Sequence, residues 1–179
     1  MKYPCILMLT LLSLVPYQAW PQKLGVQQQA IPLPVQQVGE IGLTQCTSIV
    51  EQMSQTGLQG KFQSQSGWHS KVPSKHLFQS VAILQRPDVV PSNGLVAMVA
   101  SPTDKVGCDG ALVQVFPLSG NCATAELKMT ENGAMQTPIA NINMMVTSSG
   151  DRMFLLPGAN DTCVAVSVDS FFGSRVNAH

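Results

Sequence analysis

Residues 76–101 read HLFQSVAILQRPDVVPSNGLVAMVAS, and the fold class follows largely from this stretch. Two apolar runs with many β-branched residues, 76–84 and 94–101, are separated by the turn signals RPD and PSNG. Runs of this length, bounded by Pro, Gly, Asn and Asp, predict β-strands. The unbroken apolar character of 94–101 is typical of a strand that is buried on both faces.

The same pattern continues toward the C-terminus, where turn signals such as LSGN, ENG, SSGD and PGAND separate further apolar runs. These runs are 111–117, 122–130, 142–147, 153–156 and 163–171. In 122–130, CATAELKMT, apolar and polar residues alternate along the run, which predicts a strand with one buried face. The close spacing leaves no room for crossover helices, so the sheet should be antiparallel.

One helix is predicted before the sheet, over 43–58, LTQCTSIVEQMSQTGL. Its apolar residues recur at helical spacing and form one face: Cys46, Ile49, Val50 and Met53. Glycines follow and end the pattern. Residues 43–179 are therefore predicted to be a single α+β domain, in which one N-terminal helix packs on a six- or seven-stranded, mainly antiparallel sheet.

Composition excludes several classes of partner. The chain has 179 residues, its ten basic and ten acidic side chains cancel, and only 11% of residues are charged. This balance gives no sign of nucleic-acid binding or of an anionic membrane surface. With 45% hydrophobic residues the chain can bury a core, so global disorder is not expected.

Residues 1–19 have the order of a secretory signal peptide: Lys2, then the apolar run 6–15, then Pro16 and the small residue Ala19. The apolar run is too short for a membrane-spanning helix, which needs about 20 residues. No later segment is long enough to cross a membrane either. A buried core helix is the alternative interpretation of this run.

Residues 20–42, WPQKLGVQQQAIPLPVQQVGEIG, are rich in Gln and Pro and nearly uncharged. The sequence IPLPV at 31–35 favours extended backbone, because proline fixes φ and cannot donate to a β-ladder. We expect an extended arm here. It either adds to a neighbouring protein as a strand or serves as a plain spacer.

The cysteines agree with export. Removal of the leader removes Cys5 and leaves an even number, Cys46, Cys108, Cys122 and Cys163, which predicts two disulfides. Zinc is disfavoured because no C-x2-C pair is present, and no metal or other cofactor is expected. The expected location is therefore secreted or periplasmic.

The pairing of the cysteines depends on the path of the strands. If 111–117 and 122–130 formed a hairpin in a strict meander, Cys108 and Cys163 would share one end of the sheet. Cys122 would then lie at the other end. This geometry favours Cys108–Cys163 and Cys46–Cys122, and a single connection that departs from the meander would reverse it.

No catalytic motif is present. The G-x-S-x-G elbow and the phosphate-binding glycine loops are absent, and the carboxylates Asp104, Asp109, Asp151 and Asp161 lie in or beside predicted turns. The protein is therefore not expected to be an enzyme. Asn160 begins the sequence N-D-T, which is either an N-glycan acceptor or simply a turn.

The clearest candidate for a binding site is KFQSQSGWHSKVPSKH, residues 61–76, predicted to be a long polar loop. It carries Trp68, His69, Lys71, Lys75 and His76 and no acidic residue. Lysines beside an exposed tryptophan suit an acidic protein or a glycan, and histidines would add pH sensitivity. The alternative is that Trp68 fills the core beneath a solvated loop.

These observations favour a small exported, disulfide-stabilised domain that binds a protein or glycan without catalysis, in the manner of an inhibitor or binding module. A second hypothesis is an accessory or structural subunit of an envelope or secretion assembly that uses the arm at 20–42. A hydrolase with an unrecognised site is the third.

Overall fold

The structure is a computed structural model that describes residues 31–85, 93–103, 107–140 and 142–173. The predicted signal peptide, residues 20–30 of the predicted arm, and Asp104 lie outside these residues. The helices are α1 (Leu33–Glu40), α2 (Thr47–Gly57) and α3 (Cys122–Glu131), with short 3-10 helices at Thr44–Cys46 and Pro73–Lys75. The strands are β1 (Lys61–Trp68), β2 (Phe78–Gln85), β3 (Asn93–Pro102), β4 (Cys108–Leu118), β5 (Met135–Ile139), β6 (Ile142–Val146), β7 (Arg152–Pro157) and β8 (Cys163–Phe172).

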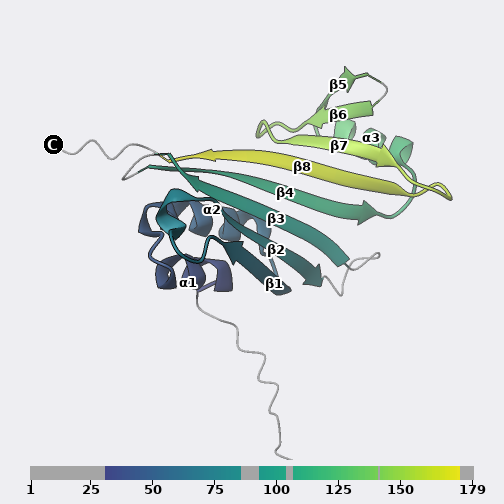
Figure 1. The fold of residues 1–179 in the computed structure, drawn as a ribbon. Coiled ribbons are helices and arrows are strands. Elements are labelled where there is room, and N and C mark those ends of the chain that lie inside the picture. The colour runs from purple at the N-terminus through teal and green to yellow at the C-terminus, as the bar shows by residue number, and fades with distance from the viewer. Residues whose placement is uncertain (1–30, 86–92, 104–106, 141, 174–179) are drawn as a thin grey trace, which may run out of the picture.

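All eight strands form one open antiparallel sheet in the order β1-β2-β3-β4-β8-β7-β6-β5 (Figure 1). The α+β class is therefore confirmed, although the structure has three helices and eight strands where one helix and six or seven strands were expected. Two four-stranded meanders, β1–β4 and β5–β8, meet where β4 pairs with β8. A strict meander would have placed β5 beside β4.

The main core lies between β1–β4 and the two N-terminal helices. On β2 the residues Phe78, Ser80, Ala82 and Leu84 are buried while their alternate neighbours are exposed. The predicted helical face of 43–58 is confirmed, since Cys46, Ile49, Val50 and Met53 all belong to this core. Helix α2 approaches β4 so closely that a Cβ on Gly110 would lie 2.7 Å from Ile49 Cγ2.

Part of the predicted extended arm is helical. Helix α1 begins directly after Pro32, and Pro34 lies in its first turn, where a missing N–H costs no hydrogen bond. Val35 and Val38 then bury their side chains in the main core. The prolines of 31–35 therefore start a helix in place of holding the backbone extended.

Residues 122–130 form a helix, and the strand prediction for them was wrong. Asn121 caps α3, because its side chain accepts a hydrogen bond from the backbone N–H of Thr124 at 2.9 Å. Ala, Glu, Leu, Lys and Met are all strong helix formers. Ala125 and Met129 are four residues apart and pack against the second core, so their spacing satisfies a helix as well as an alternating strand.

Three further expectations for the sheet need correction. Residues 61–68 form edge strand β1, so the polar loop is confined to residues 69–77. Strand β5, at Met135–Ile139, was not predicted, and all its residues are exposed. The stretch 94–101 is buried on one face only, because none of the described helices covers its other face and Val99 there is exposed.

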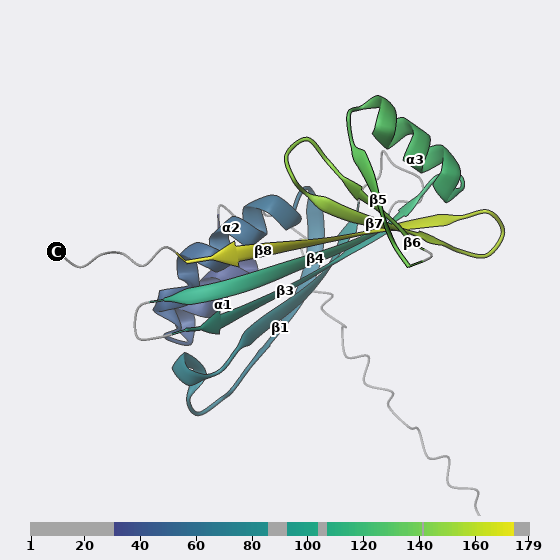
Figure 2. The ribbon, with the colours of Figure 1, turned by 90° about the horizontal axis from the view of Figure 1, so that it is seen from above.

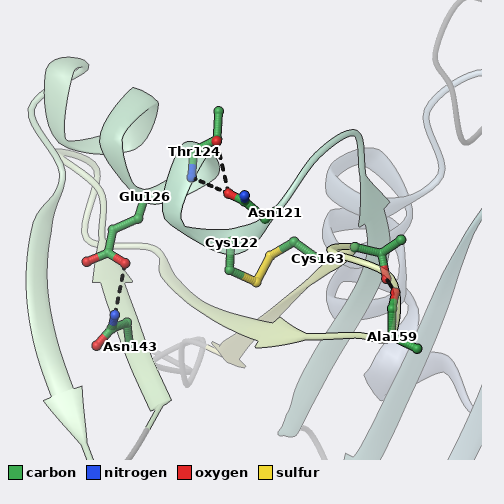
Figure 3. The surroundings of a disulfide bond; sticks show 8 residues. Asn121, Cys122, Thr124, Glu126, Asn143, Ala159 and Cys163 are labelled. Atoms are coloured by element: carbon green, nitrogen blue, oxygen red, sulfur yellow. Dashed lines mark hydrogen bonds between the residues drawn. A yellow bond between two sulfur atoms is a disulfide. The ribbon is translucent and has the colours of Figure 1, made fainter.

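Both predicted disulfides are present, but their pairing is Cys46–Cys108 and Cys122–Cys163, and the favoured pairing was wrong. Because β8 runs antiparallel beside β4, Cys163 lies opposite Leu118 at the end of β4. Helix α3 starts at Cys122, just beyond that strand end (Figure 3). Cys108 begins β4 at the opposite end, where the 3-10 helix carrying Cys46 packs.

Candidate functional site

The predicted binding residues meet at one end of the sheet, where the β1–β2 hairpin turns. Trp68 is the last residue of β1, Phe78 the first of β2, and the two lie opposite each other in the strand register. The connection between them is residues 69–77, with a 3-10 helix at Pro73–Lys75. We call Trp68, His69, Lys71, Lys75 and His76 together the tip patch.

The Trp68 side chain is partly buried and partly exposed. Its indole stacks on the ring of Phe78, with 6.3 Å between ring centroids and an interplanar angle of 19°. Phe78 is completely buried, whereas Trp68 keeps 40% of its surface exposed. The tryptophan therefore rests on the edge of the main core and presents its other side to solvent.

The two histidines of the tip patch face each other across the loop. Their rings stack at a centroid distance of 4.2 Å and an interplanar angle of 17°. The backbone N–H of Val72 donates to His69 Nδ1 at 3.0 Å, which gives His69 an acceptor nitrogen inside the loop.

Gln45, which was not predicted as a site residue, also holds this loop in place. Gln45 Nε2 donates to the backbone oxygen of Ser74 at 3.2 Å. Gln45 is next to Cys46, so this bond joins the loop to the segment fixed by the first disulfide. Its signal in the sequence is weak, because a glutamine in a Gln-rich chain gives no hint of a long-range bond.

The tip patch is basic and has apolar margins. Lys71 and Lys75 are exposed, and from Gln52 to Gln85 the chain contains no acidic residue. Val72 and Leu77, which were not predicted as site residues, are also exposed there. The structure thus places all five predicted residues, each exposed, at the same end of the β1–β2 hairpin, where positive charge, aromatic rings and aliphatic side chains occur together.

A separate groove lies beside α3, away from the tip patch. This open groove has a volume of about 360 Å³ and is lined mainly by apolar side chains, among them Leu118, Met129 and Met153. Lys128 is its one charged lining residue. Its polar lining residues are Ser119, Thr124 and Lys128, and the Thr124 hydroxyl already donates to Asn121.

The region around the second disulfide has structural hydrogen bonds. Asn121 also accepts from the Thr124 hydroxyl at 2.9 Å, and Asn143 Nδ2 donates to Glu126 at 2.9 Å (Figure 3). Asn160, the candidate glycan acceptor, is exposed in the β7–β8 turn with a φ of 55°. The Thr162 hydroxyl donates to the Ala159 oxygen in the same turn.

One carboxyl group has a shifted pKa. Partial burial raises the pKa of Asp169 on β8, the negative charge of Asp151 raises it further, and a hydrogen bond from Gln114 opposes both. Asp151 itself has the predicted turn role, since its carboxylate accepts from Ser149 Oγ at 2.6 Å. Neither carboxylate lines the groove beside α3, so this pair is not presented to a ligand bound there.

Within the described residues, no group of three or more His, Cys, Asp and Glu side chains is placed to hold a metal ion. Among the helices of this part of the chain, none has the length and apolar character needed to cross a membrane.

No protein-family model, curated protein or solved structure matches the chain. The two disulfides suggest an extracellular, disulfide-stabilised domain, because such bonds persist in oxidising compartments.

Proposed function

We propose that the protein is an exported, non-catalytic binding domain whose contact surface is the tip patch. The observation that supports this most strongly is the half-exposed Trp68, stacked on buried Phe78 and followed by a loop that carries exposed Lys71 and Lys75. A rigid aromatic anchor with cationic neighbours is a common composition for a binding hot spot. Catalysis is not part of the proposal.

The partner that fits this surface is anionic. Lysine ammonium groups attract carboxylates or sulfates, and no acidic residue of 52–85 competes for them. The indole face and the exposed side chains of Val72 and Leu77 add apolar contact area. An acidic stretch of another protein and a charged glycan share this chemistry, so separate probes are needed to distinguish them.

The charge reversal of both lysines, Lys71→Glu with Lys75→Glu, tests the proposal. We expect the dissociation constant for the preferred probe to rise at least about tenfold, because attraction to the anion becomes repulsion. Calorimetric titration with polyglutamate and with heparin would measure this effect. Binding by the unmodified protein should also weaken as salt is added.

The matched control is Lys61→Glu with Lys128→Glu, which changes the net charge equally. Lys61 begins β1 at the end opposite Trp68, and Lys128 lies on α3. This control should bind nearly as well as the unmodified protein. An equal loss in both double variants would mean a non-specific charge effect and contradict the proposal, as would the absence of binding to either probe.

Trp68→Ala separates contact from stability at the same surface. Loss of the stack on Phe78 and of the buried part of the indole should cost about 2–3 kcal/mol of folding free energy, which leaves the domain folded. Binding to the preferred probe should nevertheless be lost. A variant that unfolds would show that Trp68 is a core residue, and one that binds normally would show that the indole has no part in the contact.

A further inference from the structure

Within the part of the chain that the structure describes, no helix covers one face of the sheet. Figure 2 shows α2 and α3 on the same side of the strands. The strand register agrees with this view. One row of register partners runs across five strands on the side of the helices, in the order Ala82, Val96, Gln114, Ser167 and Met153. The alternate residues of every strand therefore point away from all three described helices.

This open face is apolar over its central strands. Two rows of register partners cross β2, β3, β4 and β8 without a charged residue. The first row is Val81, Ala97, Val113 and Val168, and the second is Ile83, Leu95, Val115 and Val166, continued by Phe154 on β7 and Met144 on β6. We call these ten residues the open-face patch. Val81, Ile83 and Val168 are each more than 40% exposed.

The patch has the area of a small interface. Its ten residues lie on strands ~4.8 Å apart, with side chains of one face every ~6.7 Å along each strand, so they cover about 320 Å² of the sheet. Apolar patches of a few hundred Å² on soluble proteins commonly mark interaction sites. Two such patches in contact would bury about 640 Å² in total, which is below the roughly 1,200 Å² of a standard interface and fits a weak, reversible dimer.

The chemistry of the patch favours a second copy of the same chain. A surface without charge needs a partner without charge at the contact, and flat faces of β-branched residues pack well against a similar sheet about 10 Å away. The chain itself supplies such a surface. Pairing by a two-fold axis would bury both copies at once and leave no unmatched apolar face.

We propose that two copies of the protein pack face to face through the open-face patch, with their helices on the outside of the dimer. The two outer layers would be helical and the two inner layers would be the sheets. The tip patch lies at the end of the β1–β2 hairpin, so this inference does not depend on the partner proposed for it.

Sedimentation of the full chain over a dilution series tests the proposal. The unmodified protein should be a dimer at micromolar concentration and dissociate on dilution. Val81→Lys with Val168→Lys places one lysine from β2 and one from β8 in the first row of the patch. It should raise the dimer dissociation constant at least about a hundredfold, because lysines would be buried without partners.

Val72→Lys is the matched control, since Val72 is a valine of similar exposure, 37% against 41% and 42%, that lies outside the patch. It should remain dimeric, and melting temperatures should show that all variants fold. The dilution series of the unmodified protein decides the proposal even if the double variant fails to fold.

Three results would overturn the proposal. The first is an unmodified protein that stays monomeric at every concentration, whether or not it binds phosphatidylcholine vesicles. The second is a dimer that the double lysine variant leaves intact. The third is a monomer that dimerises only when residues 20–30 are removed, because the patch would then be covered by the chain's own N-terminal segment.

Discussion

Replacing Cys46 and Cys108 together by alanine should destabilise the protein by about 4 kcal/mol. The bridge between them closes a loop over a sequence separation of 62, and the chain-entropy estimate for a loop of this length is about 4 kcal/mol. For a domain of this size we expect the melting temperature to fall by roughly 10–20 °C. Differential scanning calorimetry would measure the change.

Alanine is the appropriate replacement because both cysteines are buried in the main core, where a serine hydroxyl would need a hydrogen-bond partner. The matched comparison is Cys122→Ala with Cys163→Ala, whose sequence separation is 41 and whose expected loss is nearly the same. An unchanged melting temperature after removal of the first bridge would contradict the assigned role of Cys46–Cys108.

Phe78→Ala should be the most damaging single substitution among those considered. Phe78 is completely buried and supports the indole of Trp68. Removing a buried phenylalanine leaves a cavity, and such substitutions cost about 3–5 kcal/mol. Urea unfolding followed by circular dichroism would measure the loss. Binding at the tip patch should fall as well, because Trp68 would lose the ring on which it rests.

The neighbouring residue provides the control. Leu77 has 49% of its surface exposed and lies outside the core, so Leu77→Ala should change the free energy of unfolding by only about 0.5 kcal/mol. If both alanine variants proved equally stable, Phe78 would not be the packing centre at this end of the sheet.

The sequence was most informative where one local pattern had a single explanation. Strands β2 and β3 were predicted from apolar runs bounded by turn signals, and helix α2 from apolar residues at helical spacing. The even number of cysteines after the predicted leader likewise indicated two bridges. These features are local, so they can be recognised without knowledge of the tertiary fold.

The errors arose where two patterns overlapped or where long-range contacts decided the outcome. Ala125 and Met129 fit both a strand and a helix, and the Asn121 cap with good helix formers favoured the helix. Helix α3 connects the end of β4 to β5, which lies at the far edge of the sheet. The chain then returns through β6 and β7, so that β8 is the strand that pairs with β4. The cysteine pairing depended on this connection and changed with it.

The candidate site was predictable as a set of residues but not as an arrangement. The tryptophan, histidines and lysines of 61–76 were identified by composition and by the absence of acids. Their meeting at a hairpin end depends on the register that places Trp68 opposite Phe78. The open-face patch was missed because an apolar run was taken as evidence of burial on both faces.

The claim on which the rest depends is that four cysteines form two bridges in an oxidising compartment. The most direct test is a peptide map of the native protein, with free thiols blocked before any reductant is added. We predict two linked pairs, one joining Cys46 to Cys108 and the other joining Cys122 to Cys163. Four blocked thiols, or a link between Cys108 and Cys163, would contradict the account.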